Sequence, residues 1–261
     1  MGTIKILMLG DAVGKEGTNY LASGRRLSAM RKNLGADLVI INGENSAEGN
    51  GMSPSSADAL LDAGADVITG GNHTWRRREI PEALDDREEL IRPANYPAAA
   101  AGHGYGIFDV CGWRVMVINL IGCVSMEAVD SPFLTADKIL EREKGKYDVC
   151  VVDIHAEATS EKIALARYLD GRVSAVAGTH THVQTADACV LSGGTGYITD
   201  LGMCGSHAGV LGVKTECILK KFLVKTPVFF EPAVGECAAH GCLFTVDTSS
   251  GKCLAAEGIS F

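Results

Sequence analysis

The sequence lacks any C-x-x-C pair, although it contains nine cysteines scattered between positions 111 and 253. An odd number without paired spacing is a poor disulfide framework, and it indicates neither a structural zinc site nor dithiol redox chemistry. Several cysteines lie inside apolar runs such as 147–154, which is typical of small buried hydrophobic residues. We therefore expect a reducing compartment, the cytoplasm.

Long hydrophobic runs and an excess of positive charge are missing as well. The apolar segment Ile4–Leu9 is too short for a signal peptide with a cleavage site and far too short to span a bilayer. The formal net charge of -8 argues against binding of duplex DNA or an anionic membrane, which requires a basic face. A small anionic substrate would have to be bound locally, by metal ions or backbone amides.

Repeats, linkers and low-complexity segments are also missing from the 261 residues. The composition, with 46% hydrophobic and 21% charged residues, is that of an ordinary globular protein that buries a substantial core. We expect a single domain over residues 1–261, with residues 91–135 as a candidate small subdomain over a site.

Short apolar runs alternate with amphipathic stretches in a β-α-β-α-β pattern over the first seventy residues. The runs are rich in Ile, Val and Leu without polar alternation, as in strands that are covered on both faces. Two later runs around the turn Cys111-Gly112 predict an antiparallel pair. The predicted strands are 4–9, 37–42, 67–69, 105–110, 113–120, 149–154, 173–178, 194–199, 242–247 and 253–259; the predicted helices are 19–34, 53–63, 135–144, 160–169 and 215–222.

Polar residues collect directly after five of the predicted strands. In open α/β sheets, ligands bind beyond the carboxyl ends of the strands, so these residues are expected to meet at one edge. Three histidines with two acids suit a divalent ion such as manganese, iron or zinc in an open, catalytic geometry. The five clusters are Gly10-Asp11, Asn42-Gly43-Glu44-Asn45, Gly70-Gly71-Asn72-His73, Asp153-Ile154-His155 and Gly178-Thr179-His180-Thr181-His182.

Each cluster has a simpler alternative. Asp11 before Gly14-Lys15 could belong to a phosphate-binding loop, but that motif needs a longer spacing between glycines and a Ser or Thr where Glu16 stands. Asp11 could equally cap the following helix, and Asn-Gly-Glu-Asn is also ordinary turn chemistry.

The histidines have alternatives of their own. His155 could be a core histidine paired with Glu157, and His180-x-His182 could be a chance surface pair. The favoured interpretation is that these two imidazoles point to one side of an extended segment. Histidines 103, 207 and 240 are expected to be ordinary surface or loop residues, and arginines 76–78 a solvated helix face.

Taken in their order along the chain, the five strand-end clusters resemble the motifs of the calcineurin-like metallophosphoesterase superfamily, and more closely those of its YmdB-type branch. The superfamily has a His two residues after the first Asp and an Asp in the bridging position. Val13 and Glu44 stand there, as in the YmdB-type branch, and Arg76 and Cys204 differ from that branch's usual residues. The similar segments are 10–15, 42–45, 71–75, 92–97, 155–162 and 178–187.

The resemblance implies a four-layer α/β/β/α sandwich with mixed β-sheets and two divalent transition-metal ions, usually iron or manganese, with zinc as an alternative. It implies hydrolysis of phosphodiesters, with 2',3'-cyclic nucleotides as the favoured substrates. An attacking hydroxide that bridges the ions would be paired with His73 as general acid. The implied ligands are Asp11, Glu44, Asn45 and His182 for one ion, and Glu44, Asn72, His155 and His180 for the other.

Two other functions stay open. The same centre could serve a phosphomonoesterase or protein phosphatase, since metal ions do not choose between monoesters and diesters. The chain could instead be a regulatory module that binds a nucleotide or RNA without useful turnover. RNA binding and homo-oligomer formation are left open, whereas duplex DNA and membrane partners are not expected.

Overall fold

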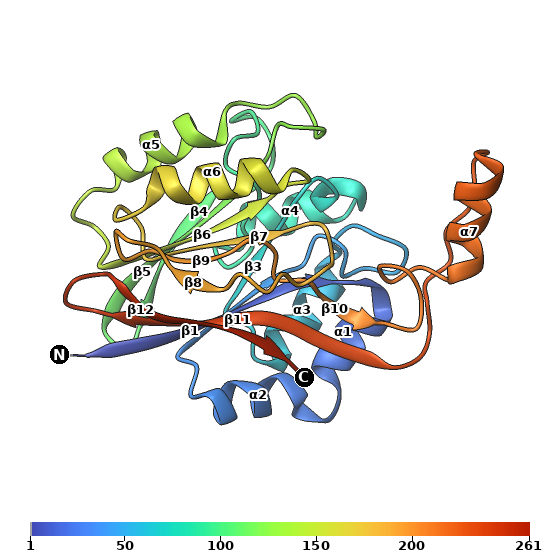
Figure 1. Cartoon of the computed structure of the whole chain (residues 1–261), viewed down its shortest axis with the longest axis horizontal. Helices are drawn as coiled ribbons and strands as arrows, with labels where there is room; N and C mark the ends of the chain where they lie inside the picture. Colours follow the sequence, from blue (N-terminus) through green and yellow to red (C-terminus); the bar gives the residue numbers. More distant parts are fainter. Residues whose placement is uncertain (1) are drawn as a thin grey trace.

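The computed structural model describes residues 2–261 and contains two six-stranded sheets packed face to face, with helices on both outer surfaces (Figure 1). The predicted four-layer α/β/β/α sandwich is therefore confirmed. No helix of residues 2–261 combines the length and the apolar character needed to cross a membrane.

The first sheet has the strand order β12-β11-β10-β1-β2-β3, and β11 also pairs with β1. Strands β10, β1, β2 and β3 run parallel, whereas β11 and β12 form an antiparallel hairpin at one side. The strands are β1 (Thr3–Ala12), β2 (Leu38–Asn42), β3 (Val67–Thr69), β10 (Met203–Ser206), β11 (Cys237–Asp247) and β12 (Cys253–Ser260).

The second sheet has the strand order β4-β5-β6-β7-β9-β8, with a parallel centre and antiparallel edges. Two strands from the segment 91–135 lie in this sheet, and the single-domain organisation of residues 1–261 stays a prediction. The strands are β4 (Tyr105–Val110), β5 (Trp113–Ile121), β6 (Val149–His155), β7 (Ala175–Thr179), β8 (Cys189–Val190) and β9 (Gly196–Ile198).

Helices cover the outer face of each sheet, and α7 projects away from the sandwich (Figure 1). None of the residues of α7 is buried. The helices are α1 (Gly14–Ala22), α2 (Arg26–Leu34) and α3 (Pro54–Ala63) on the first sheet, α5 (Pro132–Arg142) and α6 (Thr159–Leu169) on the second, α4 (Ile80–Asp86) and α7 (Thr215–Val224).

Strand β1 shows why the apolar runs carry no polar alternation. Ile6 and Met8 belong to the core between the two sheets, whereas Leu7 and Leu9 belong to the core under the helices. Successive side chains of a strand point to opposite faces, so a strand that is covered on both faces needs apolar residues at every position.

Two predicted elements differ from the structure. The expected continuous helix 19–34 is broken at Ser23–Arg25, a short 3-10 turn in which Gly24 and Arg25 have φ of 63° and 56°. Such left-handed residues cannot continue an α-helix. Arg76 ends a short 3-10 helix (Thr74–Arg76), and Arg77 and Arg78 lie between it and α4, which begins only at Ile80. The three arginines therefore do not share one face of an α-helix.

The hairpin β4–β5 follows the prediction. Val110 pairs with Trp113, and the two turn residues Cys111 and Gly112 both have positive φ, 54° and 83°. A two-residue turn with positive φ at both positions matches the twist of the flanking strands, which fixes the register of this pair.

Candidate metal centre

The carboxyl ends of strands from both sheets meet at one edge of the sandwich. Asp11 lies near the end of β1, and His155 is the last residue of β6. The loops after β2, β3 and β7 provide the rest. The contacts described below bring all eight predicted residues together: Asp11, Glu44, Asn45, Asn72, His73, His155, His180 and His182.

The tightest group of potential ligands consists of Glu44, His155 and His180. One ligand atom from each lies within 4.8 Å of the others. The Nε2 atom of His155 is 3.4 Å from Glu44 Oε1 and 3.0 Å from His180 Nδ1. Asn72 Oδ1 lies 3.1 Å from the same Nε2 atom. These four side chains could hold one ion.

A second group lies on the other side of Glu44. His182 Nε2 is 3.7 Å from Asp11 Oδ1 and 3.5 Å from Asn45 Nδ2. Asn45 Nδ2 in turn donates to Glu44 Oε1 over 2.9 Å. Glu44 thus contacts members of both groups, which is the position a bridging ligand requires.

Asp11 carries the clearest sign that this centre fits a cation. Its Oδ2 accepts from the backbone N–H of His180 over 3.1 Å, but Oδ1 is buried and has no hydrogen-bond partner within residues 2–261. A buried carboxylate oxygen without a partner is costly unless a cation neutralises it. A mixed set of carboxylate, amide and imidazole donors suits a divalent transition metal.

Gly71 leaves the space in which these side chains meet. A Cβ atom built on Gly71 would overlap with both Glu44 Oε2 and His155 Nε2. Only the absence of a side chain at this position lets the backbone of the loop after β3 approach the centre so closely.

His180 and His182 reach the centre by a route other than the predicted extended segment. Both have positive φ, 101° and 65°, a conformation that is uncommon for residues other than glycine. The prediction that both imidazoles serve one centre agrees with their contacts, but the predicted backbone is wrong. Such strained residues cluster at functional sites, where surrounding contacts enforce them.

A buried ion pair supports this loop. Lys162 Nζ donates to Asp200 Oδ2 over 2.7 Å, and neither side chain is exposed by more than 1%. The same carboxylate accepts from the backbone N–H groups of Thr181 and Gly202, over 3.1 and 2.8 Å. The pair therefore anchors the segment that carries both histidines.

A layer of polar residues behind His155 sets its tautomer. Thr179 Oγ1 donates to Asp153 Oδ1 over 2.7 Å, so it can accept from His155 Nδ1, which lies 3.0 Å away. When an ion binds and His155 keeps only the proton on Nδ1, its Nε2 atom would be free as a ligand. Sequence reasoning missed Thr179 and Asp153 as supports, although both stand in the strand-end clusters.

Opposite charges inside the centre keep its carboxylates ionised. Burial disfavours the charged form of Glu44, but the neighbouring His155 outweighs it and holds the pKa of Glu44 well below its usual value. Burial likewise disfavours charge on His155, yet Glu44 raises the pKa of His155 to about 9. Burial also disfavours the charged form of Asp11, but the nearby His182 lowers the pKa of Asp11.

Two simpler interpretations from the sequence are wrong. Asp11 does not cap α1, because that helix begins after Val13, which makes no side-chain cap. Glu157 does not pair with His155; its Oε2 lies 3.1 Å from His180 Nε2. The turn chemistry of Asn42-Gly43-Glu44-Asn45 is real, since Asn42 Oδ1 accepts from the Glu44 N–H, and it coexists with the contacts of Glu44 in the centre.

His73 lies beside Glu44 but is more accessible than the buried residues. Its Nδ1 is 3.2 Å from Glu44 Oε1 and 2.9 Å from Asn45 Oδ1, and its backbone N–H donates to Glu44 Oε2. Its side chain is 23% exposed, whereas His155 is fully buried. A substrate at the centre could therefore reach the imidazole of His73.

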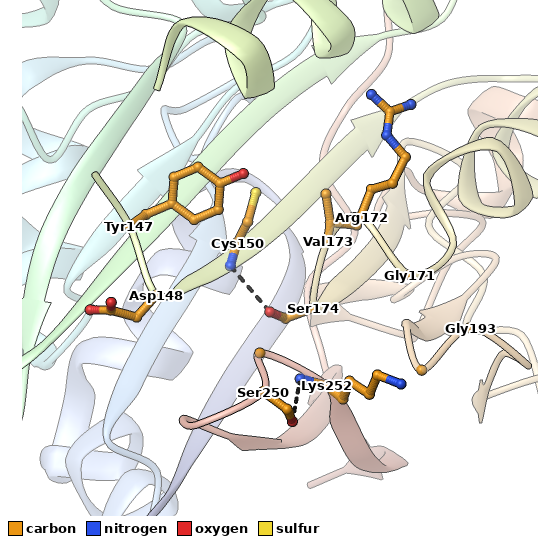
Figure 2. Close-up of a pocket in the computed structure, with 12 residues that line it drawn as sticks. Tyr147, Asp148, Cys150, Gly171, Arg172, Val173, Ser174, Gly193, Ser250 and Lys252 are labelled. Atoms are coloured by element: carbon orange, nitrogen blue, oxygen red, sulfur yellow. Dashed lines mark hydrogen bonds between the residues drawn. The ribbon is translucent and has the colours of Figure 1, made fainter. Parts of the chain in front are cut away.

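A separate cavity of about 180 Å³ lies at the opposite ends of the strands, at the start of β6 and β7 (Figure 2). Figure 2 shows Ser174 accepting from the Cys150 N–H and Ser250 accepting from the Lys252 N–H. The Arg172 guanidinium is already paired with Asp137. This cavity is remote from the candidate centre and provides none of its residues.

Known proteins match this chain along nearly its whole length. A family model for YmdB-like proteins matches residues 7–259. A 2',3'-cyclic-nucleotide 2'-phosphodiesterase of Bacillus subtilis is 41% identical over 256 residues, which cover 98% of this chain and 96% of that protein.

Two crystal structures are similar in fold as well as in sequence. A hypothetical protein from Thermus thermophilus is 38% identical, with a TM-score of 0.91 and 99% coverage of both chains. A phosphatase of Mycoplasma pneumoniae is 32% identical, with a TM-score of 0.92 and coverage of 100% of this chain and 94% of that one.

Proposed function

Since the chain belongs to the YmdB-like family, we propose that it is a metal-dependent phosphodiesterase and that 2',3'-cyclic nucleotides are its substrates. The relative from Bacillus subtilis is named for this reaction. The observation that carries the proposal is the convergence of two carboxylates and three histidines around Glu44, together with the unpartnered Oδ1 of Asp11.

Two divalent transition-metal ions are the proposed cofactors, with iron or manganese preferred and zinc as the alternative. When bound, they would lower the pKa of a water molecule and neutralise charge on the phosphoryl oxygens. Asp11, Asn45 and His182 would hold one ion, and Asn72, His155 and His180 the other. Glu44 would contribute to both sites.

His73 is the proposed general acid. Its partly exposed imidazole lies next to Glu44 and Asn45, whose side-chain oxygens orient its Nδ1 atom. The other ring nitrogen, Nε2, is then the atom that can donate a proton to the leaving alkoxide. General acid catalysis of this kind contributes about 10²–10⁴-fold to a rate.

Phosphomonoester hydrolysis is the second candidate reaction, because the Mycoplasma pneumoniae relative is described as a phosphatase. A binding module without turnover would have no need of an accessible His73 beside the ligands. The cytoplasm is the proposed location, since all nine cysteines are free. RNA binding and homo-oligomer formation stay predictions.

The deciding experiment combines metal analysis with ester assays on one sample. Protein purified without added metal should contain about two transition-metal ions per chain and cleave 2',3'-cyclic AMP and bis-p-nitrophenyl phosphate. Chelation should abolish both reactions, and p-nitrophenyl phosphate should be a poor substrate. A metal-loaded protein that cleaves none of the three esters would refute the proposal.

A further inference from the structure

A cavity of about 350 Å³ opens directly beside the candidate metal centre. His182 forms part of its wall, and this residue also faces the centre through Nε2, which lies 3.7 Å from Asp11 Oδ1. The other ring nitrogen, Nδ1, lies 3.3 Å from the carbonyl oxygen of Leu211, another wall residue. A molecule held at the centre by its phosphate would therefore extend into this cavity past His182.

The walls of this cavity combine aromatic ring faces, apolar side chains and one buried ring nitrogen that makes no hydrogen bond within the described residues. His207 and His240 form a tilted pair with ring centroids 4.7 Å apart. Met203 and Leu211 supply apolar surface. The Nδ1 atom of His240 is buried and has no hydrogen-bond partner within residues 2–261. A ligand with a flat, largely apolar face would match the ring and the apolar side chains of these walls.

The residues that line the cavity do not repel an anionic ligand. The protein as a whole carries a formal charge of -8, yet none of the residues that line this cavity bears a carboxylate. Three of them are histidines. A nucleotide would therefore meet little like charge on its way from the centre into the cavity.

The cavity is held open by rigid contacts. Gln184 Nε2 donates to the carbonyl oxygens of Gly241 and Ile259, over 2.7 and 2.9 Å, which fixes the loop after β7 to β11 and β12. The backbone N–H of His207 donates to Glu236 over 2.9 Å. A preformed cavity of this size lies within the usual range for small-molecule sites.

We infer that this cavity is the subsite for the nucleobase of the substrate. The base would stack on the exposed ring of His207, with Met203 and Leu211 against its apolar surface. Stacking on aromatic side chains, histidine included, is a general way in which proteins hold unpaired bases. The choice of a nucleotide as ligand rests on the proposed phosphodiesterase function.

The subsite can be tested with adenosine, which has no phosphate and so does not depend on the metal ions. Calorimetric titration of the metal-loaded protein should detect adenosine binding, and His207→Ala should weaken it about tenfold. His207→Ala should also raise the KM for 2',3'-cyclic AMP by a similar factor. It should leave unchanged the KM for methyl riboside 2,3-cyclic phosphate, an analogue that has no base. His103→Ala, an exposed histidine outside the cavity, is the matched control and should change neither.

The outcomes separate the subsite from the proposed function. Equal adenosine affinity in the wild type and His207→Ala, or no adenosine binding at millimolar concentration, would overturn the subsite whatever the activity. Adenosine binding that depends on His207, in a protein that cleaves no cyclic phosphate, would support the subsite and refute the proposed hydrolysis.

Discussion

At the scale of single residues, His73 and Asn72 are neighbours in sequence with different predicted duties. Asn72 Oδ1 contacts the buried His155, whereas the imidazole of His73 is accessible to solvent. His73→Ala should retain the metal ions and lose turnover by about 10²–10⁴-fold, because only proton donation is removed.

Asn72→Ala should instead lose metal, since a proposed ligand is removed. Elemental analysis of the two purified variants, with turnover measured on the same samples, distinguishes the roles. Full metal retention in Asn72→Ala would contradict its assignment as a ligand, and full activity in His73→Ala would contradict the general acid.

Gly71 gives a prediction that involves no ligand atom. Gly71→Ala introduces a methyl group that would collide with Glu44 and His155, so these two side chains must separate. We expect the metal content to fall although every proposed ligand is intact. Gly258→Ala is the control, because its added Cβ would come no closer than 3.9 Å to Gln184. Equal metal content in both variants would show that the centre tolerates the shift.

At the scale of elements, the loop after β7 depends on the buried ion pair between Lys162 and Asp200. Lys162→Met should lower the free energy of unfolding by roughly 3–5 kcal/mol, because it leaves the Asp200 charge buried without its partner. Urea denaturation measures the loss. Lys214→Met removes one partner of an exposed pair with Glu231 and should cost less than about 1 kcal/mol. Similar losses in both variants would argue against the anchoring role.

The elements that sequence patterns predicted are those whose apolar runs are long, such as β1, β5 and β6. Strand β10 was missed because Met203–Ser206 is short and contains residues of low strand propensity. Strand β10 is held in the sheet by its two neighbours: β1 pairs with it on one side, where Asp11 lies opposite Met203, and β11 pairs with it on the other. The break at Ser23–Arg25 was missed because the glycine there does not by itself end a helical pattern.

The candidate centre was predictable in its residue types but not in its supports. Polar residues that directly follow apolar strands mark the carboxyl edge of a sheet, which is why the five clusters were expected to meet. The choice of the seven ligands among them came from the resemblance to the YmdB-type branch. The hydrogen bonds of Asp153 and Thr179, and the left-handed backbone of His180, depend on contacts between segments distant in sequence. No local pattern encodes such contacts.

At the scale of the whole molecule, bound cations should add to the stability of the fold. Asp11 and Glu44 are buried carboxylates at the junction of the two sheets. Ions present at about 100 times their Kd would add roughly 2.7 kcal/mol to the free energy of unfolding. We expect a chelator to lower Tm by about 5–10 °C, and added manganese to restore it. A Tm that responds to neither reagent would contradict the predicted centre.

Helix α7, in contrast to the buried centre, is exposed along its whole length. It is ten residues long, and none of them is buried, so its backbone is supported chiefly by its own hydrogen bonds (Figure 1). Isolated helices shorter than about 12–15 residues are marginal in water. Its amide protons should therefore exchange with deuterated solvent far sooner than those of β1, which lies between β2 and β11. Within one chain, the free energy of local opening would thus range from nearly zero in α7 to the full free energy of unfolding in β1.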